Sequence, residues 1–326
     1  MSTDLRFEFH RLRFHFEAID PVMFPPGKSG NIIRGAFGRS FRAVACNSDC
    51  LDTKQCERPC AYRPIFEPRA GEVDVPSGLH DPPRPFVIRA WEFDGRRIDR
   101  GGAFWFDLHL FDVRNPRFDD YKQAFGRFAE DGVGPSQAKA KLVRVERLDL
   151  AGQPAAMRPL SIDMGAVPQG SISRLQVNFA TPTELKAEGQ PVEVPEFHVL
   201  VSRLRDRIST LRGMYGPGPL AIDFRGLAER ARFVRTVSED LQNREVTRRS
   251  GRTGQQHSIG GFEGTVVYEG ELSEFVPYLI AGRWTGVGRQ TTWGKGEIRV
   301  SRPAPAEAPR QSAVRRGQSV APDPSQ

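Results

Sequence analysis

Four cysteines, all that the chain has, lie close together in the sequence. They are Cys46, Cys50, Cys56 and Cys60, in the spacing C-x3-C-x5-C-x3-C. In a reducing compartment, thiolates grouped in this way bind a metal more often than they form disulfides, so we predict a structural zinc site with four cysteine ligands. The spacing differs from the usual C-x2-C pair, and an iron–sulfur cluster or simple reduced thiols remain alternatives. A closed site would fold the polar insertion at residues 46–64.

A glycine-rich segment near the C-terminus, residues 282–296 (GRWTGVGRQTTWGKG), forms the second group. Glycine lets the backbone approach a phosphate closely, Arg289 and Lys295 add positive charge, and Trp284 and Trp293 offer faces for base stacking. The segment is therefore predicted to grip the backbone of an RNA strand, although many hairpin turns that bind nothing are also rich in glycine. The residues expected to contact RNA here are Gly286, Gly288, Arg289, Gln290, Thr291, Trp293 and Lys295.

A run of arginines precedes this segment. Between residues 243 and 252, four arginines accompany one glutamate, with small polar residues between them. Arginine makes planar, two-pronged contacts with phosphate that lysine cannot make. We therefore expect Arg248, Arg249 and Arg252 to bind RNA, although an ordinary solvated loop has a similar composition. The net charge of +7 agrees with a nucleic-acid partner but is too small to decide the matter.

The pattern of apolar residues predicts two similar sets of elements that hold these groups. In the first half, strands are expected at residues 5–18, 86–93, 103–113 and 142–148, and helices at 31–45 and 119–130. In the second half, strands are expected at residues 173–179, 233–237, 262–268 and 298–300, and helices at 197–213 and 272–279. The apolar row of the first strand changes phase after Phe9, which we attribute to a bulge near His10 and Arg11. Each half has the order β-α-β-β-α-β, so the predicted fold class is α+β with tandem ferredoxin-like, RRM-like domains and a cysteine-rich insertion in the first.

Length and composition agree with two domains. The 326 residues are about twice the ~150 of an ordinary domain, and 22 phenylalanines are enough for packed cores. We expect an N-terminal domain over residues 1–165, a C-terminal domain over 166–301 and a disordered tail over 302–326, where apolar periodicity is lost. No apolar run approaches the length of a membrane span and the N-terminus has no secretory pattern, so we expect a cytoplasmic protein with no membrane partner.

Several of these segments resemble the CRISPR precursor-RNA-processing endoribonucleases of the RAMP superfamily. The matching pieces are residues 33–38 (IRGAFG), 132–134 (GVG), 260–264 (GGFEG) and 286–296 (GVGRQTTWGKG). The last is the most specific, because the superfamily is defined by a glycine-rich loop after the final helix of a ferredoxin-like domain. The resemblance implies binding to CRISPR repeat RNA and crRNA, and association with other Cas proteins of an effector complex. It also implies a metal-independent cut in which a 2′-hydroxyl attacks the adjacent phosphate and leaves a cyclic phosphate.

Members of this family often use a histidine at or near the first helix, and here the sequence departs from the pattern. The predicted helix at residues 31–45 contains neither histidine nor tyrosine. It offers Arg34, Arg39 and Arg42, with Lys28 in the turn before it, and these are better suited to holding phosphate charge than to taking a proton. His257 follows the arginine cluster and is expected to transfer the proton, although a mobile surface histidine is the alternative. The expected catalytic set is His257, Arg39 and Lys28, and Arg34 is expected to bind RNA.

Two other functions compete with the processing enzyme. A non-catalytic crRNA-binding subunit of a CRISPR effector complex would keep the RNA cradle without a base, and the missing histidine in the first helix favours it. A zinc-dependent DNA-binding protein would account for the cysteines but not for the glycine-rich loop. The histidines on predicted strands, His10, His15 and His109, are expected to be structural.

Overall fold

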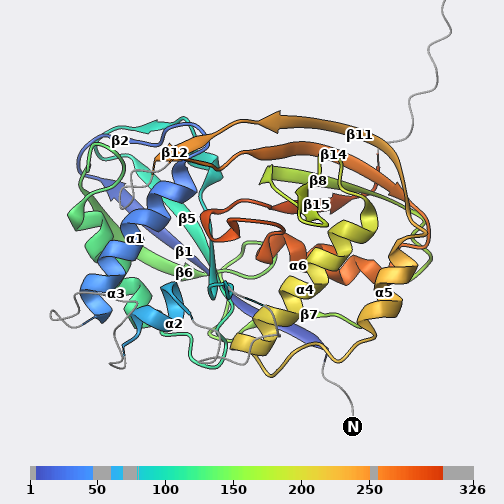
Figure 1. Cartoon of the computed structure of the whole chain (residues 1–326). Coiled ribbons are helices and arrows are strands. Elements are labelled where there is room, and N and C mark those ends of the chain that lie inside the picture. Colours follow the sequence, from blue (N-terminus) through green and yellow to red (C-terminus); the bar gives the residue numbers. More distant parts are fainter. Residues whose placement is uncertain (1–4, 47–59, 69–78, 80, 250–255, 304–326) are drawn as a thin grey trace, which may run out of the picture.

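The computed structural model describes residues 5–46, 60–68, 79, 81–249 and 256–303 (Figure 1). Two antiparallel sheets lie side by side, and helices cover one face of each. The predicted α+β class is therefore confirmed. Across the described parts of the chain, no helix has both the length and the apolar character needed to cross a membrane.

The first sheet has the strand order β3-β5-β1-β6, which is the ferredoxin-like order. Its main elements are β1 (Arg6–Ala18), α1 (Ser29–Ala45), β3 (Phe86–Arg89), β5 (Ala103–Leu110), α3 (Phe118–Asp131) and β6 (Ala140–Arg147). Smaller elements are β2 (Val22–Met23), α2 (Tyr62–Phe66), a 3-10 turn (Trp91–Phe93), β4 (Arg97–Ile98) and β7 (Leu160–Asp163). Both α1 and α3 pack on the face formed by Phe14, Phe16 and Phe106.

The second sheet repeats this arrangement with the order β11-β14-β8-β15. Its main elements are β8 (Arg174–Thr183), α4 (Phe197–Tyr215), β11 (Arg235–Arg244), β14 (Gly261–Glu269), α6 (Val276–Thr285) and β15 (Ile298–Ser301). Smaller elements are β9 (Lys186–Ala187), β10 (Gln190–Pro191), α5 (Phe224–Ala231), β12 (Thr247–Arg249), β13 (Gln256–Ser258) and 3-10 turns at Ser273–Phe275 and Thr291–Trp293. The predicted tandem ferredoxin-like fold is confirmed.

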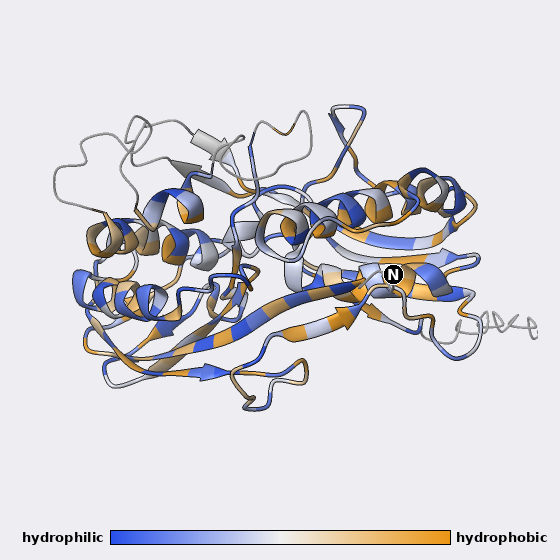
Figure 2. Cartoon of the chain, turned by 90° about the horizontal axis from the view of Figure 1, so that it is seen from below, coloured by the Kyte–Doolittle hydropathy of each residue, from blue (hydrophilic) through white to orange (hydrophobic). Residues whose placement is uncertain are grey.

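Strand β1 contributes to the cores of both domains. Phe7 and Phe9 lie in the core of the second sheet, whereas Leu12 and Phe14 lie in that of the first. Successive side chains of a strand point to opposite faces of it. Where the strand passes from one core to a core on its other face, the apolar positions in its sequence must therefore shift by one residue. Pairing with β5 runs from His10 to Glu17 without a register shift, and the shift in the pairing with β6 lies between His15 and Phe16, so the bulge predicted near His10 and Arg11 is wrong. Figure 2 shows this strand extending from the N-terminal end across the molecule.

The element boundaries differ from the prediction in two informative places. The strand expected at residues 86–93 ends at Arg89 and gives way to the 3-10 turn that carries Trp91. The strand expected at 233–237 runs instead from Arg235 to Arg244. It is the edge of its sheet and almost all its side chains are exposed, so it lacks the apolar alternation by which sequence patterns reveal a strand.

Candidate functional site

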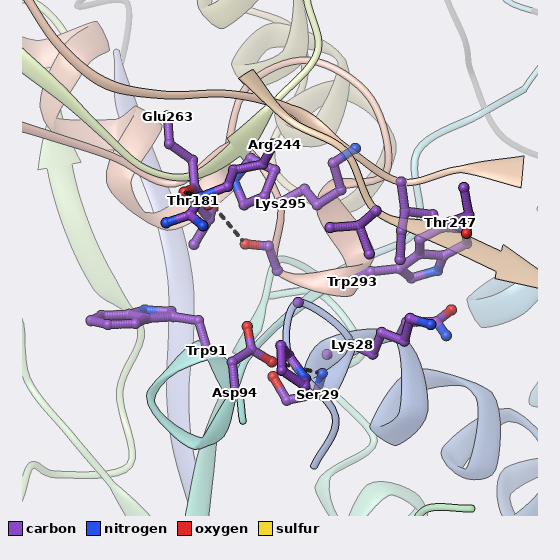
Figure 3. A pocket seen from close by; sticks show the side chains of 18 of the residues that line it. Lys28, Ser29, Trp91, Asp94, Thr181, Arg244, Thr247, Glu263, Trp293 and Lys295 are labelled. Carbon is purple, nitrogen blue, oxygen red and sulfur yellow. Dashed lines mark hydrogen bonds and ion pairs between the residues drawn. The ribbon is translucent and has the colours of Figure 1, made fainter. Parts of the chain in front are cut away.

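A cavity of about 600 Å³ lies where the two domains meet (Figure 3). The first domain contributes the turn before α1, the first residues of α1, Trp91 and Asp94. The second domain contributes the end of β11, residues 245–247 and part of the glycine-rich segment, including Trp293 and Lys295. We call it the interdomain cavity. It brings together the start of α1 and the C-terminal glycine-rich segment, which are far apart in the sequence.

The N-terminus of α1 is fixed at this cavity by a carboxylate from another segment. Oδ1 of Asp94 accepts a hydrogen bond of 2.9 Å from the backbone N–H of Ser29. This satisfies an N–H at the end of the helix that has no partner within the helix, and places negative charge at the positive end of the helix dipole. Burial raises the pKa of the Asp94 carboxyl, while hydrogen bonds from Ser29, Lys28 and Gly27 oppose that rise.

The glycine-rich segment is packed between the domains. A Cβ added to Gly30 of α1 would lie 2.0 Å from the carbonyl oxygen of Trp293, so helix and loop are in close backbone contact. The carbonyl oxygen of Gly294 accepts hydrogen bonds from Arg89 Nη1 (2.7 Å) and from Thr181 Oγ1 (3.0 Å). Gly294 also has a φ of 85°, which glycine adopts at little cost. Packing against protein backbone is thus one physical reason for glycine in this loop.

Two of the side chains expected to face RNA are buried. Trp284 is 3% exposed and its ring packs against Phe9 at 5.4 Å and His109 at 5.1 Å between ring centroids, so its predicted role as a stacking face is wrong. Lys295 is 6% exposed, and its Nζ donates to the carbonyl oxygen of Gly260 (2.6 Å) and to Oε1 of Gln290 (2.8 Å). Burial lowers the pKa of Lys295 to about 8.

A second cavity of about 680 Å³ is lined by residues 288–293 of the loop, and Trp293 lines both cavities. We call it the arginine cavity. Its cationic side chains are Arg34, Arg84, Lys186, Arg203, Arg207 and Arg289, and its acidic ones are Asp81, Glu184 and Asp206. Arg289 is partly neutralised, because Nη1 lies 2.7 Å from Oε1 of Glu184. Cations exceed acids by three in the lining, which favours an anionic ligand.

The structure therefore gathers several predicted RNA-binding residues in one place. Arg34, Gly288, Arg289, Gln290, Thr291 and Trp293 all line the arginine cavity. Sequence reasoning missed Arg203 and Arg207 of α4, because arginines on an amphipathic helix resemble an ordinary solvated face. Arg207 Nε donates to the carbonyl oxygen of Thr285 (3.0 Å), and burial lowers its pKa to about 9.

The three predicted catalytic residues are placed differently. Lys28 lines the interdomain cavity. Arg39 is exposed on α1, eleven residues beyond Lys28, and at 1.5 Å per residue it lies roughly 16 Å farther along the helix axis. The structure therefore does not bring these two together. The backbone of His257 pairs with that of Arg248 between β13 and β12, but the side chains of His257, Arg248 and Arg249, and all of Arg252, lie outside the described structure.

The backbone of His257 belongs to the hairpin of β12 and β13, and the residues that flank this hairpin line the interdomain cavity. Val246 and Ile259 at its base both line the cavity, and their backbones are joined by a hydrogen bond of 2.7 Å from Ile259 N–H to the Val246 carbonyl oxygen. The side chain of Val246 lies against Gly27, just before α1. The base of the hairpin is thus fixed beside the start of α1.

The three strand histidines have contacts within the fold, which agrees with the structural role predicted for them. His109 is buried, its Nδ1 lies 2.9 Å from the carbonyl oxygen of Trp284, and burial lowers its pKa to about 3. His10 is buried edge-on against Phe118, with a pKa of about 4 for the same reason. Nε2 of His15 pairs with Oε2 of Glu146 at 2.6 Å.

Two of the four cysteines of the predicted metal site belong to the described residues. Cys46 follows the last residue of α1 and Cys60 lies shortly before α2, whereas Cys50 and Cys56 fall outside the described residues. Within the described ranges, no group of three or more histidine, cysteine, aspartate or glutamate side chains could hold a metal ion. The zinc or iron–sulfur site with four cysteine ligands stays a prediction.

Two models of known protein families match the sequence. The family model of the CRISPR-associated endoribonuclease Cas6 matches residues 177–298. The C-terminal domain belongs to the Cas6 family. A second family model, described as an N-terminal domain, matches residues 7–165. The match supports a CRISPR-associated repeat-RNA endoribonuclease, and so favours the enzyme over the non-catalytic subunit and the DNA-binding protein.

Solved structures share the fold across most of the chain. Cas6 from Thermus thermophilus is 14% identical, with a TM-score of 0.54, and the match covers 90% of this chain and 98% of that one. A Cas6 product complex is 20% identical, with a TM-score of 0.50 and coverage of 90% and 99%. A partial Cas6-RT-Cas1–Cas2 complex is 12% identical, with a TM-score of 0.54, and covers 91% of this chain and 46% of that one. No curated protein matched the sequence.

Proposed function

We propose that this protein is a Cas6-type endoribonuclease that holds CRISPR repeat RNA in the arginine cavity and cuts it at the interdomain cavity. The observation that carries the proposal is that both cavities share Trp293, with an excess of cations on one side and the N-terminal turn of α1 on the other. An RNA strand that follows the arginines passes Trp293 and enters the interdomain cavity. A partly exposed tryptophan at this junction offers a stacking surface for an unpaired base.

The proposed reaction is attack of a 2′-hydroxyl on the adjacent phosphate, which leaves a cyclic phosphate and a 5′-hydroxyl. The nucleophile belongs to the substrate, so no activated water is needed, and side-chain cations can balance the charge that develops on the phosphate. We therefore expect cleavage without a metal ion. His257 is our proposed proton-transfer group and Lys28 our proposed phosphate contact, whereas Arg39 is assigned to RNA backbone along the exposed side of α1.

The interacting partners follow from the same assignment. We propose that the protein remains bound to crRNA after cleavage and acts in the cytoplasm. One structural neighbour is part of a Cas6-RT-Cas1–Cas2 complex, which supports association of this chain with other Cas proteins.

The test is cleavage of labelled repeat RNA in EDTA, compared with the same RNA carrying a single 2′-deoxy nucleotide at the cut site. The proposal expects cleavage of the unmodified strand alone, with a cyclic phosphate on the upstream product. Tight binding without cleavage would support the non-catalytic alternative. Cleavage at an unchanged rate by His257→Ala would remove that histidine from the mechanism but not the reaction.

The RNA-binding part of the proposal needs a separate measurement. Arg207→Met should weaken binding and reduce its dependence on salt, because a protein that neutralises fewer phosphates releases fewer counterions when it binds. Arg225→Met on α5 is the matched control, since its side chain is 90% exposed and lies outside the lining of both cavities. Equal affinities for the two variants would refute the arginine cavity as the RNA site.

A further inference from the structure

Lys295 is a buried cation without an acidic partner in the described part of the chain. The two acceptors of its Nζ, the Gly260 carbonyl oxygen and the Gln290 side-chain oxygen, are both neutral. Glu184 raises the pKa of Lys295 through its charge, but the same carboxylate is paired with Arg289. A charge that is taken out of water is costly unless an opposite charge compensates it. The surroundings of Lys295 are therefore incomplete without an anion.

Among the described residues, the geometry leaves one donor of this ammonium for such an anion. An ammonium group has three N–H donors, and acceptors in the described part of the protein occupy two of them. Lys295 belongs to the lining of the interdomain cavity, together with Lys28 and the first turn of α1 (Figure 3). The anion that the proposed function brings to this cavity is the phosphate at the cut site.

We propose that Lys295 is the general acid that protonates the leaving 5′ oxygen when the RNA is cut. This inference rests on the proposed function, and assigns a role that neither the arginines nor Lys28 can fill as well. Arginine holds its proton at any physiological pH, and Lys28 is only half-buried. Lys295 alone among the lysines of this cavity combines burial with fixed hydrogen-bond partners.

The 2′-hydroxyl gives its proton to the base, for which His257 is proposed above, and the 2′ oxygen forms a bond to phosphorus. The bond between phosphorus and the 5′ oxygen breaks, and that oxygen takes a proton from Nζ of Lys295. The products are a 2′,3′-cyclic phosphate, a 5′-hydroxyl and a neutral amine, which regains its proton from water after release.

The environment supports this role. A proton donor works best when its pKa is close to the working pH, and lysines are tuned to that range by burial. Burial lowers the pKa of Lys295 to about 8, which keeps it mostly protonated at neutral pH and yet ready to release the proton. A lysine that only anchored the hairpin base to the loop would do so as well with an ordinary pKa.

The decisive experiment uses RNA in which sulfur replaces the bridging 5′ oxygen at the cut site. A thiolate leaves without protonation, so this substrate does not need a general acid. Lys295→Gln should slow single-turnover cleavage of the oxygen substrate by about 10²-fold or more, and that of the sulfur substrate by only a few-fold. Lys122→Gln, an exposed lysine on α3, is the control and should cut both substrates as the wild type does. Equal slowing of both substrates by Lys295→Gln would assign Lys295 a structural role and overturn the proposal.

A measurement on the wild type keeps the test independent of how the variant folds. The ratio of the sulfur rate to the oxygen rate should be constant below pH about 8 and rise about tenfold per pH unit above it, as the acid loses its proton. A ratio that stays flat to pH 10 would overturn the proposal. If the wild type cuts neither substrate, the proposed function fails instead, so the two failures are distinguishable.

Discussion

The contact between α1 and the glycine-rich loop can be tested by adding one methyl group at Gly30. The Cβ of Gly30→Ala would lie 2.0 Å from the carbonyl oxygen of Trp293, well inside the 3.0 Å that real Cβ atoms keep. The atom it meets is backbone, so it cannot swing away as the end of a flexible side chain would. Either α1 or the loop must therefore shift by about 1 Å, in the wall of the interdomain cavity.

The size of the effect follows from two opposing terms. Overpacking of a well-packed contact costs roughly 1–3 kcal/mol, while replacing glycine by alanine in a helix contributes about 0.5–1 kcal/mol of stability. Gly35 of the same helix has nothing within 4 Å of an added Cβ, so Gly35→Ala gains the helix term without the clash. The helix contribution is common to both variants and cancels, so their free energies of unfolding should differ by the clash alone, about 1–3 kcal/mol, with Gly30→Ala the less stable.

Urea unfolding of both variants measures this difference, and single-turnover cleavage of repeat RNA shows whether the site is disturbed. We expect Gly30→Ala to cut more slowly at saturating RNA, because the start of α1 and the loop no longer keep their spacing. Superimposable unfolding curves for the two variants would refute the reasoning, because they would mean that the helix and the loop are not in close contact.

Three further predictions follow from individual groups. The folded state holds Lys295 with a lowered pKa, so the unfolded chain binds more protons than the folded protein between pH about 8 and 10. The free energy of unfolding should therefore rise with pH in that window, and rise less in Lys295→Gln. Equilibrium denaturation at several pH values measures this difference. Trp284→Ala should destabilise the fold by about 3–5 kcal/mol, since the ring fills the core between the sheets, and an unchanged melting temperature would contradict this. If the four cysteines hold a metal, the purified protein should contain zinc or iron that Cys60→Ala loses, and metal analysis that finds neither would end the prediction.

Much of the architecture could be predicted from local patterns. The helix predicted over residues 31–45 starts within two residues of the observed start at Ser29, because Ile33, Phe37 and Phe41 recur at helical spacing and a proline and glycine turn precedes them. The repeated β-α-β-β-α-β order predicts the tandem ferredoxin-like fold. The exposed edge strand β11 is predicted only at its first residues, since a strand without a buried face leaves no alternation to detect.

The site itself depended on contacts between distant residues. The sequence determined that residues 282–296 form a glycine-rich, cationic loop, and that arginines abound near it. Only the tertiary structure decided that Trp284 is in the core, that Lys295 is buried without an acidic partner in the described part of the chain, and that Arg207 faces the same cavity as Arg34. Burial and charge pairing are properties of a whole neighbourhood, and residues of β1, α1 and α4 that lie far from the loop in the sequence create that neighbourhood.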